Sequence, residues 1–299
     1  MGIYSEEILT KYCSVVSDTE AKKIENAKSM IKDAVNDSNE FSGLDYEIFE
    51  QGSYANNTNV KFDSDIDVCV MLKSTFYGEY PDGLTYKDYK FEVGITYDDY
   101  KRRAVRALNK KFGDVNMQIG NKSIKIKSNS YRVNADVVIA FQYRDYKSVN
   151  SKNPDIYTEG TKFISGSNDS VINYPKQHIF NGKSKDEITN LGYKKLVKIF
   201  KKIKNNMEEK GLIDAKKISS FLVESLVWNV PNGIITNNDS WLETVKVAIK
   251  YLHNEIKNNK CSEWREVSEC LYLFRGKRKW TQQDAQDFLL KMWRHMEYK

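Results

Sequence analysis

The chain has 299 residues, 40% of them hydrophobic, and a formal net charge of +6 at pH 7. This length and apolar content suffice for one large folded domain or two modest ones, and they argue against a disordered chain. No apolar run reaches the roughly 18 residues of a membrane span, and the N-terminal segment is acidic and amphipathic, unlike a signal peptide. We therefore expect a cytoplasmic, monomeric protein that does not bind membranes.

The cysteines are scattered along the chain, at Cys13, Cys69, Cys261 and Cys270, and there are three histidines. No group of them has the spacing of a structural zinc site. We expect four reduced cysteines that serve as packing residues.

The first elements along the chain have clear boundaries. Ser17 and Glu20 form a capping box, and apolar residues then recur at helical spacing, which predicts a helix over 18–36. The segment "YEIFEQG" alternates like a strand and stops at Gly52, and "IDVCVML" predicts a second strand. Thr96 and Gly113 are typical start and end signals of a helix and predict a further helix between them.

The periodicity of the apolar residues changes from strand-like to helix-like between the two halves of the sequence. The first half continues with short β-type runs, "VNMQIG", "SIKIKS" and "YRVNADVVIAF", which predict a sheet built from hairpins. From Tyr174 onward, helical periodicity dominates in "TNLGYKKLVKIFKKIKNNMEEKG", "AKKISSFLVESLVWNVP", "SWLETVKVAIKYLHNEIKNN" and "TQQDAQDFLLKMWRHMEY". We expect a mixed α/β half and a helical half with a cleft between them.

An acidic ladder, Asp63, Asp65 and Asp67, stands at the start of the second predicted strand. Alternate strand residues share a face, so Asp65 and Asp67 project side by side and form a hard-oxygen site suited to Mg²⁺. Asp136 interrupts a later apolar strand and must be paired or bind metal, because burying an unpaired charge is costly. Together these acids predict a site for two divalent ions about 4 Å apart, which would activate a hydroxyl group and stabilise a leaving pyrophosphate.

Eleven residues, most of them polar, separate the pair Gly52-Ser53 from Asp65. Without a side chain, Gly52 lets backbone N–H groups approach phosphate oxygens, and the Ser53 hydroxyl can donate a further hydrogen bond. Taken singly, a Gly-Ser pair is an ordinary turn and an Asp-x-Asp is often a solvated strand edge or a cap. Their order along the chain, with Asp136 in a later strand, favours a phosphate and metal site.

At these residues the sequence resembles a known family. Gly52-Ser53, eleven residues, Asp65-Ile66-Asp67 and the later Asp136 are similar to the signature of the polymerase-β-type nucleotidyltransferases. The chain most resembles the group of oligoadenylate synthase, cyclic GMP-AMP synthase and the bacterial cGAS/DncV-like nucleotidyltransferases (CD-NTases). The resemblance extends into "INYPKQHIFNG", "GYKKLVKIFKKIKNNM" and "ISSFLVESLVWNVPN". It implies an α+β fold, with a nucleotidyltransferase core and N-terminal helix in residues 1–165 and a helical domain, residues 166–299, that closes the nucleotide cleft.

The resemblance also implies roles for individual residues. Asp65, Asp67 and Asp136 would be the catalytic residues and would hold two Mg²⁺ ions, or Mn²⁺, while Asp63 would be a supporting or solvated acid. The donor triphosphate would be bound by Gln51, Gly52, Ser53, Lys198 and Ser220, with Lys202 and Ser219 as alternatives to the last two.

The activity implied by the resemblance is condensation of nucleoside triphosphates into a cyclic di- or trinucleotide, with release of pyrophosphate. This second messenger would activate a separate effector protein in cyclic-oligonucleotide-based antiphage signalling (CBASS). The animal DNA sensor has a zinc-bearing insertion that no Cys/His cluster here could build, so we do not expect activation by duplex DNA. The alternatives are transfer to another acceptor, an RNA end or a small molecule, and a catalytically silent nucleotide or RNA binder.

Three further features have both a functional and a structural interpretation. The helix "GYKKLVKIFKKIKNNM" gathers Lys194, Lys198, Lys201 and Lys202 toward one face, either to bind phosphate or as a solvated amphipathic surface. The cluster "RGKRKW" at 275–280 is a nucleic-acid patch or, as we favour, a solvated loop before a helix that begins at Thr281. His178 either touches a nucleotide or is a packed histidine.

Overall fold

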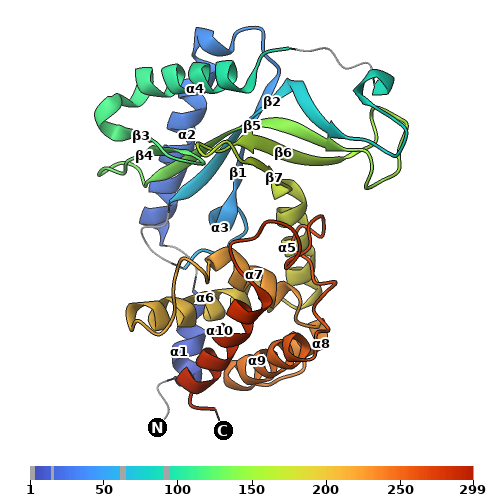
Figure 1. Ribbon diagram of the computed structural model, residues 1–299. Coiled ribbons are helices and arrows are strands. Elements are labelled where there is room, and N and C mark those ends of the chain that lie inside the picture. Colours follow the sequence, from blue (N-terminus) through green and yellow to red (C-terminus); the bar gives the residue numbers. More distant parts are fainter. Residues whose placement is uncertain (1–3, 15–16, 61–64, 90–93, 299) are drawn as a thin grey trace. The chain divides into compact units, whose positions relative to one another are not determined.

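The computed structural model describes residues 4–14, 17–60, 65–89 and 94–298, and these divide into two compact units (Figure 1). The sheet unit consists of Val16–Ala55 and Lys61–Lys176, and the helical unit of Met1–Val15, Asn56–Val60 and Gln177–Lys299. This division differs from the boundary expected between residues 165 and 166. Helix α1 (Glu6–Tyr12) belongs to the helical unit because it buries Leu9 in the core of that unit.

A seven-stranded mixed sheet forms the sheet unit. Its strands are β1 (Tyr46–Gln51), β2 (Ile66–Glu79), β3 (Met117–Ile119), β4 (Ile124–Ile126), β5 (Ala135–Asp145), β6 (Thr158–Ile164) and β7 (Ser170–Asn173). They are ordered β1-β2-β5-β4-β3, with β6 paired to the end of β5 and β7 paired to β6. The expectation of a sheet built from hairpins is wrong at its centre, where β2 and β5 are parallel. The chain between them contains helix α4 (Tyr97–Phe112), and so is long enough for a crossover.

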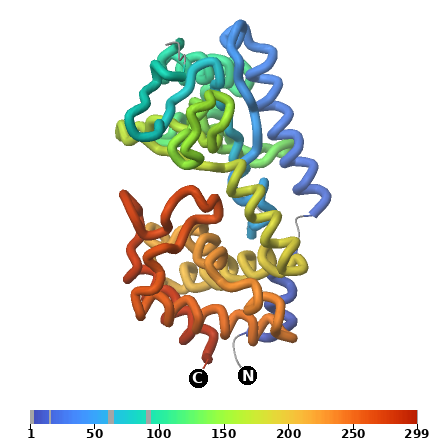
Figure 2. Tube along the Cα trace, turned by 90° about the vertical axis from the view of Figure 1, so that its right-hand side faces the viewer, coloured from blue at the N-terminus to red at the C-terminus, as the bar shows by residue number. Residues whose placement is uncertain are grey.

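Two capped helices pack against this sheet. Helix α2 (Asp18–Asn36) runs as one continuous helix (Figure 2), and the Ser17 hydroxyl accepts a hydrogen bond from the N–H of Glu20 at its start. Helix α4 begins in the same way at Thr96. Both predicted helix starts are therefore confirmed, and of the predicted capping box at α2 the bond to the Ser17 hydroxyl is formed. Apolar side chains of α2 and α4 share one buried cluster with those of β2 and β5.

The helical unit has its own apolar core. Its helices are α1, α5 (Pro175–Ile188), α6 (Tyr193–Glu209), α7 (Ser220–Trp228), α8 (Asn232–Thr236), α9 (Trp241–Lys257) and α10 (Gln282–His295). Helix α6 contributes a fully buried apolar stripe. Helix α10 starts at the position that the sequence predicted, and the structure adds a capping box between Thr281 and Asp284. Within the described ranges, no helix has the length and apolar character needed to cross a bilayer.

The four cysteines are free, as expected from their spacing. Cys69 and Cys261 are completely buried and belong to the cores of the sheet unit and the helical unit respectively. They act as small packing residues.

We predict that Phe288→Ala destabilises the protein by about 3–5 kcal/mol, because Phe288 is buried in the core of the helical unit and its removal leaves a cavity. The free energy of unfolding is measured by urea denaturation. The matched control is Phe180→Ala, since 70% of Phe180 is exposed, and it should change stability by no more than about 0.5 kcal/mol. Equal effects of the two substitutions would contradict this assignment of the core.

Candidate active site

The central strand pair brings the predicted acids together. In the parallel register of β2 and β5, Asp67 lies directly opposite Asp136, on strands that are about 4.8 Å apart. Asp65 immediately precedes β2 and interacts electrostatically with both. Asp63 lies outside the described residues. Three of the four acids that the sequence singled out therefore form one cluster.

This cluster is electrostatically strained without a counter-charge. Burial, and then the charges of Asp136 and Asp65, raise the pKa of Asp67 to about 7. Burial also raises the pKa of Asp136, although a hydrogen bond and a nearby lysine oppose the shift. A divalent cation would relieve the repulsion among these carboxylates.

Gly52 packs directly against this cluster. It begins the short helix α3 (Gly52–Ala55), where the sequence predicted a simple turn, and the preceding residue, Gln51, pairs with Asp67 across the sheet. Gly52 has φ +72°, and a methyl group on its Cα would overlap a carboxylate oxygen of Asp67. Only glycine satisfies both the backbone conformation and the close approach. The Gly-Ser motif and the acidic cluster are thus one local structure.

Sequence analysis missed two polar residues, one just before β4 and one within it, that support Asp136. The Ser123 hydroxyl donates a hydrogen bond to Asp136 Oδ1 at 3.0 Å. Lys125 is the register partner of Asp136 on the antiparallel strand, and its ammonium lies 3.9 Å from Asp65 Oδ2. The signal was present in "SIKIKS", where alternation with buried isoleucines places Ser123 and Lys125 on one face.

The residues predicted to bind the donor triphosphate from the helical half lie on α6 and α7. Lys198 is 3% exposed, and its ammonium donates hydrogen bonds to Asn57 Oδ1 at 3.1 Å and to the carbonyl of Ser14 at 3.3 Å. Lys202 is only partly buried. The phosphate roles of these two lysines stay predictions.

The two serines differ in their surroundings. The Ser219 hydroxyl caps α7 by accepting a hydrogen bond from the N–H of Leu222. Ser220 is the first residue of α7 and is exposed. The capping role makes Ser220 the better placed of the two to meet a ligand, and its phosphate role stays a prediction.

The basic cluster "RGKRKW" is largely structural. Arg278 forms a buried ion pair with Glu266, with 2.6 Å between Nη1 and Oε1, and Arg275 pairs with the carboxylate of Glu263. These ion pairs support the interpretation as a loop before α10. His178 is also packed, with its Nε2 3.0 Å from Glu224 Oε1.

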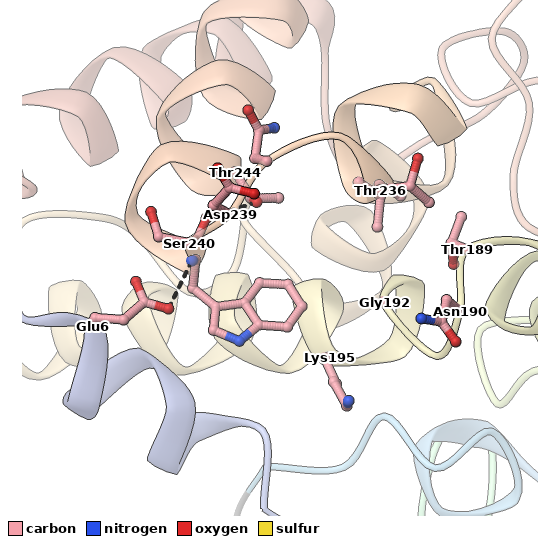
Figure 3. Close-up of a pocket in the computed structure, with 12 residues that line it drawn as sticks. Glu6, Thr189, Asn190, Gly192, Lys195, Thr236, Asp239, Ser240 and Thr244 are labelled. Carbon is pink, nitrogen blue, oxygen red and sulfur yellow. Dashed lines mark hydrogen bonds between the residues drawn. The ribbon is translucent and has the colours of Figure 1, made fainter.

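A cavity of about 340 Å³ lies elsewhere in the helical unit (Figure 3). The carboxylate of Glu6 points at the start of α9 and accepts hydrogen bonds from the N–H groups of Trp241 and Leu242, at 2.8 and 3.0 Å. Glu6 therefore occupies the helix terminus that an anionic ligand would otherwise use. None of the predicted site residues lines this cavity, which marks the junction of α1 with α9.

Comparison with known proteins connects both halves of the chain to one family. Residues 28–127 match the nucleotidyltransferase domain family, and residues 180–297 match the cGAS/DncV-like nucleotidyltransferase C-terminal helical domain. The cyclic dipyrimidine nucleotide synthase CdnE of Cecembia lonarensis is 41% identical and that of Legionella pneumophila 37% identical, covering 99–100% of both chains in each pair. The chain belongs to the cGAS/DncV-like nucleotidyltransferases.

Solved CD-NTase structures agree in fold over almost the whole chain. The Elizabethkingia meningoseptica CdnE cyclic dinucleotide synthase, solved with GTP and Apcpp, has a TM-score of 0.83 and 31% identity, covering 99% of this chain and all of its own. This chain is therefore a nucleotidyltransferase that synthesises cyclic oligonucleotides, with the expected polymerase-β-like core and helical domain. Membership of the CD-NTases favours this activity over transfer to another acceptor and over a silent binder.

The acidic cluster of this CD-NTase has the donor chemistry that Mg²⁺ requires. Within the described part of the chain, no three His, Cys, Asp or Glu side chains already converge closely enough to hold a metal ion. Asp65, Asp67 and Asp136 nevertheless offer only carboxylate oxygens, the ligands that Mg²⁺ prefers together with substrate phosphates. Burial, followed by repulsion between the carboxylates, raises the pKa values of Asp67 and Asp136, and a cation bound among these residues would lower both.

We predict that Asp67→Asn lowers nucleotidyl transfer at least about 100-fold and raises the melting temperature at pH 8 in the presence of a chelator. The raised pKa means that the folded state disfavours the ionised carboxylate. This penalty is absent below 3.8, the ordinary pKa of an aspartate, and complete above about 7, so the gain in stability should be smaller at pH 5. Thermal denaturation at both pH values tests this. Asp155→Asn, at an exposed acid, is the control, and a loss of stability at pH 8 would contradict the prediction.

We also predict that Gly52→Ala abolishes activity, because the added methyl group displaces the Asp67 carboxylate. Gly43→Ala is a matched control: Gly43 has φ +75° and open space around it, so this substitution introduces the same backbone strain without the overlap. Initial rates of pyrophosphate release compare the two variants. Similar losses in both would mean that backbone strain, rather than the position of Asp67, limits catalysis.

Proposed function

We propose that this CD-NTase condenses two nucleoside triphosphates into a cyclic dinucleotide in a Mg²⁺-dependent reaction. The observation that carries the proposal is the pairing of Asp67 with Asp136 across β2 and β5, with Gly52 packed against Asp67. Asp65, Asp67 and Asp136 would hold the cations. When bound, the cations would neutralise developing charge on the phosphoryl oxygens and the leaving pyrophosphate.

The residues of the sheet unit have distinct tasks in this reaction. The start of α3 offers backbone N–H groups that helical hydrogen bonding does not use, and with the Ser53 hydroxyl these bind the donor phosphates. Asp136 orients the acceptor ribose hydroxyl and can take its proton. The hydrogen bond from Ser123 fixes the rotamer of Asp136, and its second oxygen stays available for that proton. Gln51, Lys198 and Ser220 keep their predicted roles as phosphate ligands.

Pyrimidine nucleotides are the first candidates for the substrates. Two full-length relatives, at 41% and 37% identity, are named cyclic dipyrimidine nucleotide synthases. Relatives at 33% and 32% identity are named cyclic GMP-AMP synthase and cyclic dipurine nucleotide synthase. Base choice thus varies within the family at this level of similarity, so all four nucleotides belong in the assay.

The biological role that we propose is production of a second messenger in antiphage signalling (CBASS), where the product binds a separate effector protein. This role rests on the family resemblance. It predicts that protection of cells carrying this gene and its effector is lost with the Asp65→Asn/Asp67→Asn variant. The cytoplasmic location, the monomeric state and independence from duplex DNA stay predictions of the sequence.

Incubation of the purified protein with the four ribonucleoside triphosphates and Mg²⁺ tests the activity directly. After phosphatase treatment, mass spectrometry should detect a resistant cyclic dinucleotide containing a pyrimidine. The Asp65→Asn/Asp67→Asn variant should give none, and EDTA should abolish synthesis, with recovery on adding excess Mg²⁺ or Mn²⁺. Undiminished synthesis in EDTA would overturn the metal requirement, and a product made only of purine nucleotides would overturn the proposed substrate class.

A further inference from the structure

The polar spacer between Gly52-Ser53 and Asp65 is partly buried. After Ala55 the chain leaves the sheet unit, and Asn56–Val60 belongs to the helical unit. Asn56 is 3% exposed and Thr58 is completely buried, although both are polar. A linker without a structural role would be exposed to solvent. The burial of Asn56 and Thr58 indicates that they pack specifically against the helical unit.

Thr58 is held by a buried ion pair from two helices. Lys201 of α6 and Glu224 of α7 lie 2.5 Å apart, between Nζ and Oε2, and their side chains are 2% and 6% exposed. The Lys201 ammonium donates hydrogen bonds to both oxygens of Thr58, at 3.1 Å to Oγ1 and 3.2 Å to the carbonyl. The Thr58 hydroxyl donates to Glu224 Oε2 at 3.0 Å. We call these three residues the Thr58 anchor.

Neighbouring contacts extend this arrangement. His178 of α5 bonds the second carboxylate oxygen of Glu224, so both oxygens are satisfied. Burial alone would raise the pKa of Glu224, but the charges and hydrogen bonds of Lys201 and His178 outweigh it and hold that pKa well below its usual range. Asn57 adopts φ +53°, and its side-chain oxygen accepts the hydrogen bond from Lys198. Two lysines of α6 therefore hold consecutive residues of the spacer.

The buried ion pair of Lys201 and Glu224 contributes more to selecting one backbone conformation than to the free energy of unfolding. A buried ion pair gains little over apolar residues of the same size, because removing two charges from water offsets their attraction. The Thr58 anchor instead fixes one conformation of the chain. The anchored residue lies six positions after Gly52 and seven before Asp65, and both of these belong to the acidic cluster and its glycine.

We propose that the Thr58 anchor is a positioning device for nucleotidyl transfer: Lys201 and Glu224 fix Thr58, and the residues that join Thr58 directly to α3 restrain that helix and Gly52 at its start. Thr58, Lys201 and Glu224 contact no reacting atom in this role. Loss of the anchor should lower kcat, because a displacement of about 1 Å at a reacting group lowers rates about 100-fold. The proposal rests on the synthase activity of the family, so its test includes a measurement that needs no turnover.

Thr58→Val is the first test, because it removes the hydroxyl and keeps the volume. We expect kcat to fall at least about 10-fold, with a melting temperature close to that of the wild type. The matched control is Thr244→Val, at a buried threonine of the same unit whose hydroxyl donates to the carbonyl of Ser240. Wild-type kcat in Thr58→Val would overturn the proposal, as would a loss of kcat that follows the melting temperature equally in both variants.

Lys201→Met/Glu224→Leu is the second test and covers the case in which Thr58→Val folds poorly. This double substitution removes both charges of the ion pair together and, apart from the bonds to Thr58, costs only the hydrogen bond between His178 and Glu224, so it should destabilise the protein less than either single substitution. Lys204→Met is its control, because Lys204 lies on the same helix and pairs with Glu208, away from the spacer. A double variant with normal stability and normal kcat would overturn the proposal.

Hydrogen exchange tests the anchor independently of catalysis. Amide exchange of peptides that contain residues 52–58, measured without nucleotide, should be faster in Thr58→Val and in the double variant than in either control. Unchanged exchange would show that the spacer is held by other contacts and would overturn the proposal. Faster exchange in a protein that makes no cyclic product would leave the anchor in place and count against the proposed synthase activity alone.

Discussion

The pairing of β2 with β5 places two carboxylates, those of Asp67 and Asp136, side by side in a largely buried environment. Like charges at this separation repel strongly, and burial makes each of them less favourable. The surrounding structure responds to this constraint. Ser123, just before β4, donates a hydrogen bond to Asp136, and Lys125 on β4 places a positive charge near Asp65. A cation bound among these carboxylates would relieve the repulsion that remains.

Local sequence patterns predicted much of this arrangement. Capping residues gave the starts of α2 and α4, and the alternation of apolar residues gave the strands β1 and β2 themselves. The spacing from Gly52-Ser53 to Asp65 identified the acidic cluster, because glycine and buried acids are each unusual in a strand context. These features were predictable because each depends on residues close together in the chain.

Other features depend on partners that are distant in sequence, and local patterns do not encode them. The parallel register of β2 and β5 decides that Asp67, rather than Asp65, faces Asp136. From the sequence, the lysines of α6 were expected either to bind phosphate or to lie on a solvated surface. Two of its lysines, Lys198 and Lys201, are buried, because Glu224 of α7 and residues of the spacer provide partners for their ammonium groups. The spacer is rich in polar residues, and nothing in its composition indicates that Thr58 is completely buried.

The helical unit combines three segments that are far apart in the chain, and this limits how it can fold during synthesis. Helix α1 emerges early, yet Leu9 is buried among residues of helices that are translated last, and Glu6 caps α9. A ribosome-bound chain that ends before α9 offers α1 only part of its packing surface, because α1 contacts both α6 and α9. A fragment that begins at Gln177 lacks both α1 and the threonine that bonds a lysine and a glutamate inside its core. The helical unit is therefore completed only after the whole chain has been made, and it is not a module that can be exchanged between relatives as a single continuous segment.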